Sequence, residues 1–409
     1  MIKRLKTELN NLWWLRLYPR IKMSWNKLWW LRHAVYITLA GTVAANLILY
    51  SISPRKKSFP MVEAWPEGWI LVNRSRVVVG GHSNAADFAH QVHIAYSSMV
   101  NGACIFAGQP FHCAVTRFEP DPLLDTGFFE DISHNVPSCD GCPRGKTLVY
   151  DHCKNLPHVV DAGMLPDYPR RHCGPDGAPG CLDSTEHLRK PSQRVYLQRG
   201  ANDKCYRKGS VANTQSLYFQ LMDDPRTQVV FNNTLPYKHE IPIYEEYDGP
   251  KECFKHTISN GMELNPKMVS TKEANIYRFK QDKFDGYDTW VGTNEWGWLY
   301  VPKTCTNESD SKQPCSLFVY FRPCGGGSGE TDSHFDSFDR WAEKNRIVIL
   351  VPVIGKNLCY LKYNGCHEVA RGCWDGYGQL GKDYALQSGK HMKFVGSMLK
   401  DFLATYGVD

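Results

Sequence analysis

The chain has 409 residues, of which 42% are hydrophobic and 12% aromatic, which is enough to bury a large core and excludes a chain that is disordered throughout. The formal net charge is +6, but the first 57 residues hold 11 basic side chains and a single acid, Glu8. The rest of the chain is therefore near neutral, which argues against a nucleic-acid-binding surface.

The N-terminal region contains an uncharged apolar segment. Residues 34–52 read AVYITLAGTVAANLILYSI, close to the ~20 residues that a helix needs to cross a bilayer. Because basic residues are concentrated before this segment, we expect residues 1–33 to be a basic, tryptophan-rich cytosolic tail and residues 34–53 a transmembrane signal anchor. Residues 54–70 would then link the anchor to a lumenal or extracellular domain. The alternative is a cleaved signal peptide, which would make the protein secreted.

Cysteine content points to the same kind of compartment. The chain has 15 cysteines, which is typical of an oxidising environment, and sequons at Asn73, Asn232 and Asn307 offer glycosylation sites on a lumenal chain. The densest cysteine region runs from Cys139 to Cys181, within a candidate insertion at about residues 120–190, and contains a single CxxC motif in SCDGCPRG. Zinc sites built from such motifs need a second well-spaced pair, so we expect a disulfide-stapled insertion here, with no metal and no other cofactor.

The first candidate for catalysis is GGHSNAAD at residues 80–87. The β-branched run RVVV at residues 76–79 predicts a buried strand, and the segment AADFAHQVHIAYSSM predicts a helix. Ser83 would therefore stand on a strand-to-helix turn. The small residues Gly81 and Ala85, two positions away on either side, are what a nucleophile elbow requires. The alternative is an ordinary serine in a loop of small residues.

An acid and a base follow at the ends of two later predicted strands. Asp203 follows RVYL at residues 194–197, and His239 follows the β-branched segment TQVVF. Serine, acid and histidine come in the chain order of α/β-hydrolases. An imidazole can take the proton of a serine hydroxyl, and a carboxylate can hold the imidazole in the right tautomer. Taken alone, Asp203 could instead cap a turn and His239 could lie on the surface.

A glycine-rich loop follows the apolar segment SLFVYF at residues 316–321. This loop, RPCGGGSGE, can turn backbone N–H groups toward an oxyanion. The alternatives are a flexible linker and a phosphate loop, and the phosphate loop is set aside because the lysine and Ser/Thr of the Walker pattern are absent.

These segments occur together in one family of esterases. Over about residues 71–409, the sequence resembles the poly(3-hydroxybutyrate) depolymerases in which the α/β-hydrolase chain is circularly permuted. In the first half the resemblance rests on GGHSNAADFAHQVHIAYSS, FAGQPFHCA, the turn from Gly200 to Asp203, and HEIP beginning at His239. In the second half it rests on GWLYVPKTC, CSLFVYFRPC, WAEKNRIVILVPV and GCWDG.

The resemblance implies a fold and a set of roles. The fold is α/β, an α/β-hydrolase-like sheet with helices on both faces, circularly permuted and here preceded by the N-terminal transmembrane helix. The resemblance implies that Ser83, Asp203 and His239 form a catalytic triad. The backbone N–H groups of Asn84 and Cys324 would form the oxyanion hole, and Trp374 would line the substrate crevice. The resemblance also implies the disulfides Cys305–Cys315 and Cys324–Cys373, and proximity in the sequence adds Cys359 with Cys366.

The expected function is that of a membrane-anchored serine esterase. Its partners would be a hydroxyalkanoate-like or other ester and, through the N-terminal helix, a membrane, with no nucleic acid. A carbohydrate ester is a narrower alternative substrate, because the fold alone does not choose it. The sequence departs from the family pattern at Ala85 and Ala86, at Arg322 and Pro323 before the oxyanion cysteine, and in GCWDG. These departures leave a second interpretation open, a catalytically weak or inactive hydrolase fold that acts as a binding module.

Overall fold

The computed structural model describes residues 60–113, 178–265, 276–306, 313–325 and 335–409, apart from residues 64, 67, 336, 364, 365 and 382. The predicted tail and anchor, nearly all of the predicted insertion and the sequon at Asn307 lie outside these ranges. Within the described ranges, no helix has the length and apolar character needed to span a bilayer. Residues 59–409 cluster as one unit.

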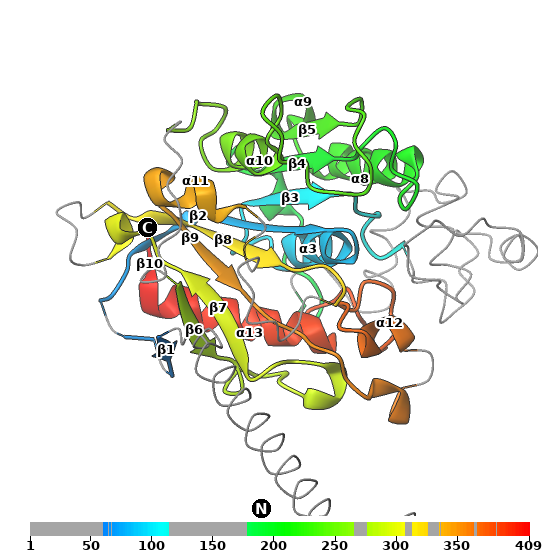
Figure 1. Cartoon of the computed structure of the whole chain (residues 1–409), viewed down its shortest axis with the longest axis vertical. Helices are drawn as coiled ribbons and strands as arrows, with labels where there is room; N and C mark the ends of the chain where they lie inside the picture. The colour runs from blue at the N-terminus through cyan, green and yellow to red at the C-terminus, as the bar shows by residue number, and fades with distance from the viewer. Residues whose placement is uncertain are drawn as a thin grey trace, which may run out of the picture. The chain divides into compact units, whose positions relative to one another are not determined.

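A ten-stranded mixed sheet forms the centre of this unit (Figure 1). The strand order is β1-β6-β7-β9-β8-β2-β3-β4-β5, with β10 paired to the start of β2. Strand β7 is antiparallel to both of its neighbours, and the other pairs are parallel. In sheet order the strands are Met61–Val62, Ile276–Lys280, Trp296–Tyr300, Ile347–Val351, Cys315–Phe321, Val72–His82, Gly102–Phe106, Arg194–Gln198 and Val229–Asn232, and β10 is Gly407–Val408.

Strands β2 and β8 are neighbours although β8 comes about 230 residues later in the chain. Their register pairs Val79 with Val319 and Gly81 with Phe321. The segment before Ser83 and the segment before the glycine-rich loop therefore end at the same edge of the sheet, because parallel strands share their carboxyl ends. The sheet thus places these two segments side by side although they lie far apart in the sequence.

Helices cover both faces of the sheet. Strand residues alternate between the faces, so that Val77 and Val79 lie in one hydrophobic cluster and Val78 in another. The first cluster includes α3 (Asn84–Ala95), α8 (Lys208–Leu221) and α13 (Lys390–Tyr406); the second includes α10 (Gly249–Thr257) and α11 (Asp339–Asn345). The shorter helices are α7 (Glu186–Arg189), α9 (Pro225–Gln228), α12 (His367–Ala370), η6 (Thr289–Val291), η7 (Lys303–Cys305) and η8 (Cys359–Leu361).

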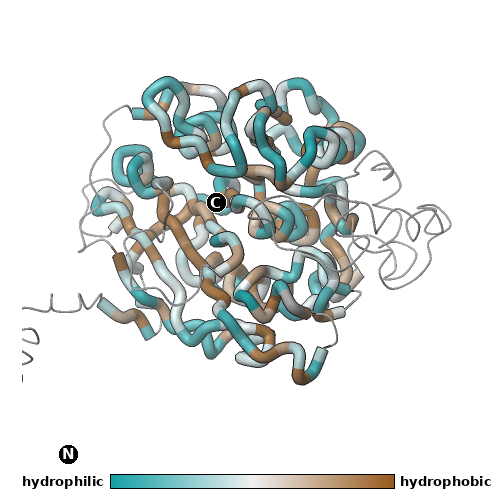
Figure 2. Tube along the Cα trace, turned by 45° about the vertical axis from the view of Figure 1, so that its right-hand side comes forward, coloured by the Kyte–Doolittle hydropathy of each residue, from teal (hydrophilic) through white to brown (hydrophobic). Residues whose placement is uncertain are grey.

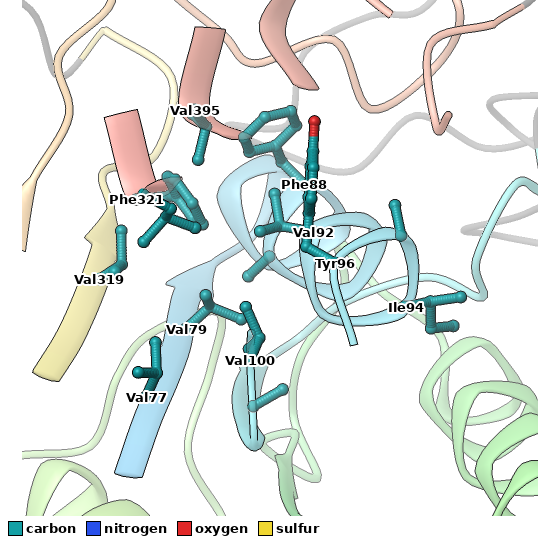
Figure 3. Close-up of a cluster of buried hydrophobic side chains, with 14 of the residues drawn as sticks. Val77, Val79, Phe88, Val92, Ile94, Tyr96, Val100, Val319, Phe321 and Val395 are labelled. Atoms are coloured by element: carbon teal, nitrogen blue, oxygen red, sulfur yellow. The ribbon is translucent and has the colours of Figure 1, made fainter. Parts of the chain in front are cut away.

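Helix α3, which begins directly after Ser83, is buried along its whole length. Figure 3 shows Phe88 and Val92 of this helix lying between strands β2 and β8 and Val395 of α13. Full burial of one such side chain stabilises the fold by about 1.5–3 kcal/mol. In the Cα trace, hydrophobic stretches run through the middle of the described part, and hydrophilic stretches are common at its rim (Figure 2). The start of α3 is therefore held by the core and not by a surface loop.

Disulfides join both nearby and distant segments of this unit. The expected pairs Cys305–Cys315, Cys324–Cys373 and Cys359–Cys366 are all present. A fourth pair, Cys104–Cys253, joins β3 to α10 across 149 residues and was not expected. Every cysteine in the described ranges is disulfide-bonded. Glycosylation of Asn73 and Asn232, which are both half-buried, stays a prediction.

Candidate active site

Ser83 occupies the sharp turn between β2 and α3. Its backbone has φ 60° and ψ −132°, in the left-handed half of conformational space that side chains disfavour. Its N–H donates to the Phe106 carbonyl of β3 at 2.9 Å, and its carbonyl accepts from the Ala86 N–H at 2.8 Å. A Cβ at Gly81 would lie 2.4 Å from the Ala85 carbonyl oxygen, so only glycine fits two residues before the serine. The local sequence thus folds into the strained elbow that it predicts.

The Asp203 carboxylate is buried and held by three donors. It accepts hydrogen bonds from the backbone N–H groups of Cys205 at 2.7 Å and Tyr206 at 3.0 Å, and its other oxygen is 2.9 Å from Nδ1 of His239. Burial alone raises the pKa of the Asp203 carboxyl, but the hydrogen bond and charge of His239 and the two N–H groups outweigh it, so this pKa lies below its usual value. The carboxylate is therefore ionised and aimed at the imidazole.

Glycine allows the loop that carries the acid to approach the loop that carries the base. A Cβ at Gly200 would lie 2.1 Å from the Tyr237 carbonyl oxygen. Without that Cβ, the N–H of Ala201 donates to the carbonyl of Leu235 at 2.7 Å, and the N–H of Asn202 donates to the carbonyl of Tyr237 at 3.0 Å. These bonds fix the segment that leads directly into His239.

Two further aromatic rings contact the His239 imidazole. Tyr206 stacks on it with an interplanar angle of 6° and a centroid distance of 5.4 Å, and the Tyr206 hydroxyl donates to Asp87 of α3 at 2.7 Å. The ring of His82 lies 4.5 Å from that of His239. Burial and the nearby His239 lower the pKa of His82 to about 3, so His82 is neutral at physiological pH. Reasoning from the sequence missed both residues; only the position of His82 next to the serine could have drawn attention to it.

The three residues of the expected triad are brought to the same edge of the sheet. Asp203 and His239 are in direct contact, and the ring of His82, the residue before Ser83, packs against the ring of His239. Among the described residues, no hydrogen bond joins the Ser83 hydroxyl to His239. Catalytic hydrogen bonds are often long without substrate and tighten in the complex.

The two expected oxyanion donors lie on connected segments. Asn84 is the first residue of α3, and its side-chain amide donates to the Trp374 carbonyl at 2.9 Å. Cys324 follows strand β8 and is disulfide-bonded to Cys373, next to Trp374. The loop after β8 and the start of α3 are thus fastened to one segment, residues 373–374.

The expected role of Trp374 is not what the structure shows. Its side chain is only 1% exposed and stacks on Phe88 of α3 at 4.5 Å, while its indole N–H donates to the Arg322 carbonyl at 3.2 Å. A ring enclosed in this way packs the core behind the loops and does not line an open crevice. The ring of Trp374 is buried because it packs against α3, and the spacing of GCWDG in the sequence does not reveal this packing.

A cavity of about 730 Å³ opens beside the acid and the base, and both residues line it. Asp203, Cys205 and His239 place three potential metal-ligand atoms close together. Cys205 is disulfide-bonded and offers no thiolate, and the Asp203 oxygens already accept three hydrogen bonds. The arrangement suits proton transfer better than metal binding.

Comparison with known proteins finds relatives of the chain. No protein-family model matches the chain. It is 22% identical over 350 residues to a poly(3-hydroxybutyrate) depolymerase of Delftia acidovorans, and 24% identical over 348 residues to a polyhydroxybutyrate depolymerase of Talaromyces funiculosus. The chain is similar to poly(3-hydroxybutyrate) depolymerases. These matches cover 81% and 82% of the chain, and 60% and 91% of the respective relatives.

Solved poly(3-hydroxybutyrate) depolymerase structures share the fold. The structure from Penicillium funiculosum and a depolymerase complexed with an R3HB trimer each match with a TM-score of 0.58 and 18% identity. Each match covers 86% of this chain and all of the solved chain. The mixed α/β sheet described above is therefore the depolymerase-like, α/β-hydrolase type of fold.

Proposed function

We propose that this protein is a serine esterase of the polyhydroxybutyrate depolymerase type, with Ser83 as nucleophile, His239 as general base and Asp203 as its orienting acid. The observation that carries the proposal is the 2.9 Å contact between His239 and a buried, ionised Asp203. The His239 ring also lies 4.5 Å from the ring of His82, which directly precedes Ser83 in its strained elbow. Homology to depolymerases supports ester hydrolysis as the reaction class.

The proposed reaction passes through an acyl-enzyme. Oγ of Ser83 attacks the ester carbonyl carbon while Nε2 of His239 accepts the hydroxyl proton, and Asp203 stabilises the imidazolium through Nδ1. The backbone N–H groups of Asn84 and Cys324 would donate to the oxyanion of the tetrahedral intermediate. His239 then returns the proton to the leaving alcohol. Water, deprotonated by the same ring, hydrolyses the acyl-serine and releases the acid.

We also propose the substrate class and the compartment. A structural neighbour is a depolymerase complexed with an R3HB trimer, which supports hydroxyalkanoate-like oligoesters as substrates here. The disulfide-bonded cysteines support an oxidising compartment, lumenal or extracellular. Anchoring by residues 34–53 stays a proposal from the sequence.

Labelling of the active serine tests the nucleophile. The full chain is treated with a fluorophosphonate probe beside Ser83→Ala and a matched control, Ser216→Ala, whose hydroxyl lies on the exposed side of α8. We expect labelling of the unmodified chain and of Ser216→Ala, and none of Ser83→Ala. No labelling of the unmodified chain, together with no turnover of short-chain esters, would favour the binding module.

Turnover of the same esters tests the acid and the base. We expect His239→Ala to abolish turnover and Asp203→Asn to lower kcat by a factor on the order of 10⁴, because asparagine favours the wrong tautomer of the imidazole. His256→Ala on α10 is the control and should retain full activity. Full turnover by His239→Ala would reject the assignment of the base.

A further inference from the structure

Basic side chains dominate the cavity beside the acid and the base. The residues that line it are Arg199, Ala201, Asn202, Asp203, Lys204, Cys205, Arg207, Lys238 and His239. Asp203 is the one carboxylate in this set, and its oxygens are occupied by His239 and two backbone N–H groups. Among the described residues that line the cavity, four are therefore cationic and none offers them a free acid.

Three of these cations are available to a ligand. Lys204, Arg207 and Lys238 are exposed, and none of them forms an ion pair with an acid in the described part of the chain. The fourth, Arg199, is 6% exposed and donates to the backbone carbonyls of Tyr206 at 2.5 Å and Asp203 at 2.6 Å. Arg199 thus shapes the acid loop and adds positive charge beneath the cavity.

Helix α8 adds to the positive potential. Arg207 is the N-cap residue of this 14-residue helix, and no side chain caps its first N–H groups. The N-terminus of a helix carries a partial positive charge that favours anions within the first turn. Together with the side chains of Lys204, Arg207 and Lys238, the helix end makes this an anion-attracting cavity in contact with the catalytic imidazole.

We propose that the site selects esters that carry a carboxylate, with the carboxylate held by Lys204, Arg207 and Lys238 while the ester lies at Ser83. Oligoesters of hydroxy acids that end in a free acid fit this chemistry, and neutral esters of the same length do not use the cations. The proposal rests on the esterase function proposed above, because it assigns a substrate preference to the same site.

Binding of a matched ligand pair tests the preference without relying on turnover. The full-length Ser83→Ala protein is titrated by calorimetry with an R-3-hydroxybutyrate trimer that ends in a free carboxylate, and with the same trimer ending in a primary amide. We expect the acid to bind more tightly by a factor on the order of tenfold at low salt, since each exposed ion pair contributes only modestly. This ratio should approach one in 1 M salt, which screens exposed charges within about 3 Å.

Two sets of substitutions locate the preference. Replacing Lys204, Arg207 and Lys238 together by glutamine should reduce the acid-to-amide ratio to about one. The control removes the same net charge elsewhere, by Lys255→Gln, Lys283→Gln and Lys393→Gln, whose ammonium groups pair with Glu263, Asp401 and Asp285. The control set should keep the ratio, and circular dichroism checks that both sets fold.

The outcomes separate this inference from the proposed function. Equal binding of acid and amide, binding of neither, or a ratio that survives the loss of the three cavity cations overturns the inference. Preferential binding of the acid by Ser83→Ala, with no hydrolysis of either trimer by the unmodified chain, supports the inference and refutes the esterase. Hydrolysis of both trimers with no binding preference supports the esterase and overturns the inference.

Discussion

Replacing Ser83 by glycine should stabilise the protein relative to Ser83→Ala. The serine has φ 60° and ψ −132°, close to the first central position of a type II′ turn, where glycine is favoured. Holding a side-chain-bearing residue there costs about 1–3 kcal/mol, whereas glycine costs about 0.4–1 kcal/mol through the entropy of the unfolded chain. The difference predicts that Ser83→Gly has a free energy of unfolding about 1 kcal/mol higher than that of Ser83→Ala.

Equilibrium unfolding in urea measures this difference, because both variants lack the hydroxyl and differ only in the Cβ. Ala212→Gly is the control, since Ala212 lies within α8 in ordinary helical geometry. There the same removal of a Cβ should lower the free energy of unfolding by about 0.5–1 kcal/mol. If Ser83→Gly is less stable than Ser83→Ala by the amount that Ala212→Gly loses, the elbow is not strained and the reasoning is wrong.

Three further perturbations test the surroundings of the site. Tyr206→Phe keeps the ring on the imidazole but removes a hydrogen bond to the buried Asp87, so the free energy of unfolding should fall by about 1–3 kcal/mol. His82 is neutral in the folded protein and has a pKa of about 3, so its contribution to the free energy of unfolding is full above pH 6.5 and is lost as the pH falls toward 3. Between about pH 7 and about pH 4.5, the free energy of unfolding of His82→Leu should therefore fall by less than that of the unmodified chain, as measured by urea titrations. Replacing Cys104 and Cys253 together by serine should cost about 2–5 kcal/mol in the same assay, and an unchanged midpoint would mean that this disulfide does not stabilise the fold.

The parts of the site that the sequence predicts are those set by short-range sterics. Gly81 and Gly200 are each required because a Cβ would meet a backbone carbonyl oxygen. The sequence shows this requirement as a glycine at a fixed spacing before Ser83 or Asp203. The strand before the serine is longer than RVVV predicts, running from Val72 to His82. The polar first half of this strand gives no β-strand signal in the sequence. Its extended conformation is fixed instead by pairing with β8 and β10.

The parts that the sequence does not predict depend on packing between distant segments. Tyr206 acquires its contacts from Asp87, 119 residues away, and from a histidine on another loop. The Cys104–Cys253 disulfide depends on α10 lying over β3. Trp374 is enclosed by Phe88 of α3. None of these contacts follows from local spacing, so a family pattern could indicate that Trp374 stands near the site but not which way its ring faces.

The order of strands also bears on how the protein is made. A ribosome delivers β2 long before β8, so during synthesis the serine-bearing strand has β3 on one side and bare N–H and C=O groups on the other. Exposed strand edges of this kind invite pairing with foreign chains. A nascent chain of this protein therefore keeps this edge of β2 unpaired by β8 until the strand that precedes the glycine-rich loop has been synthesised.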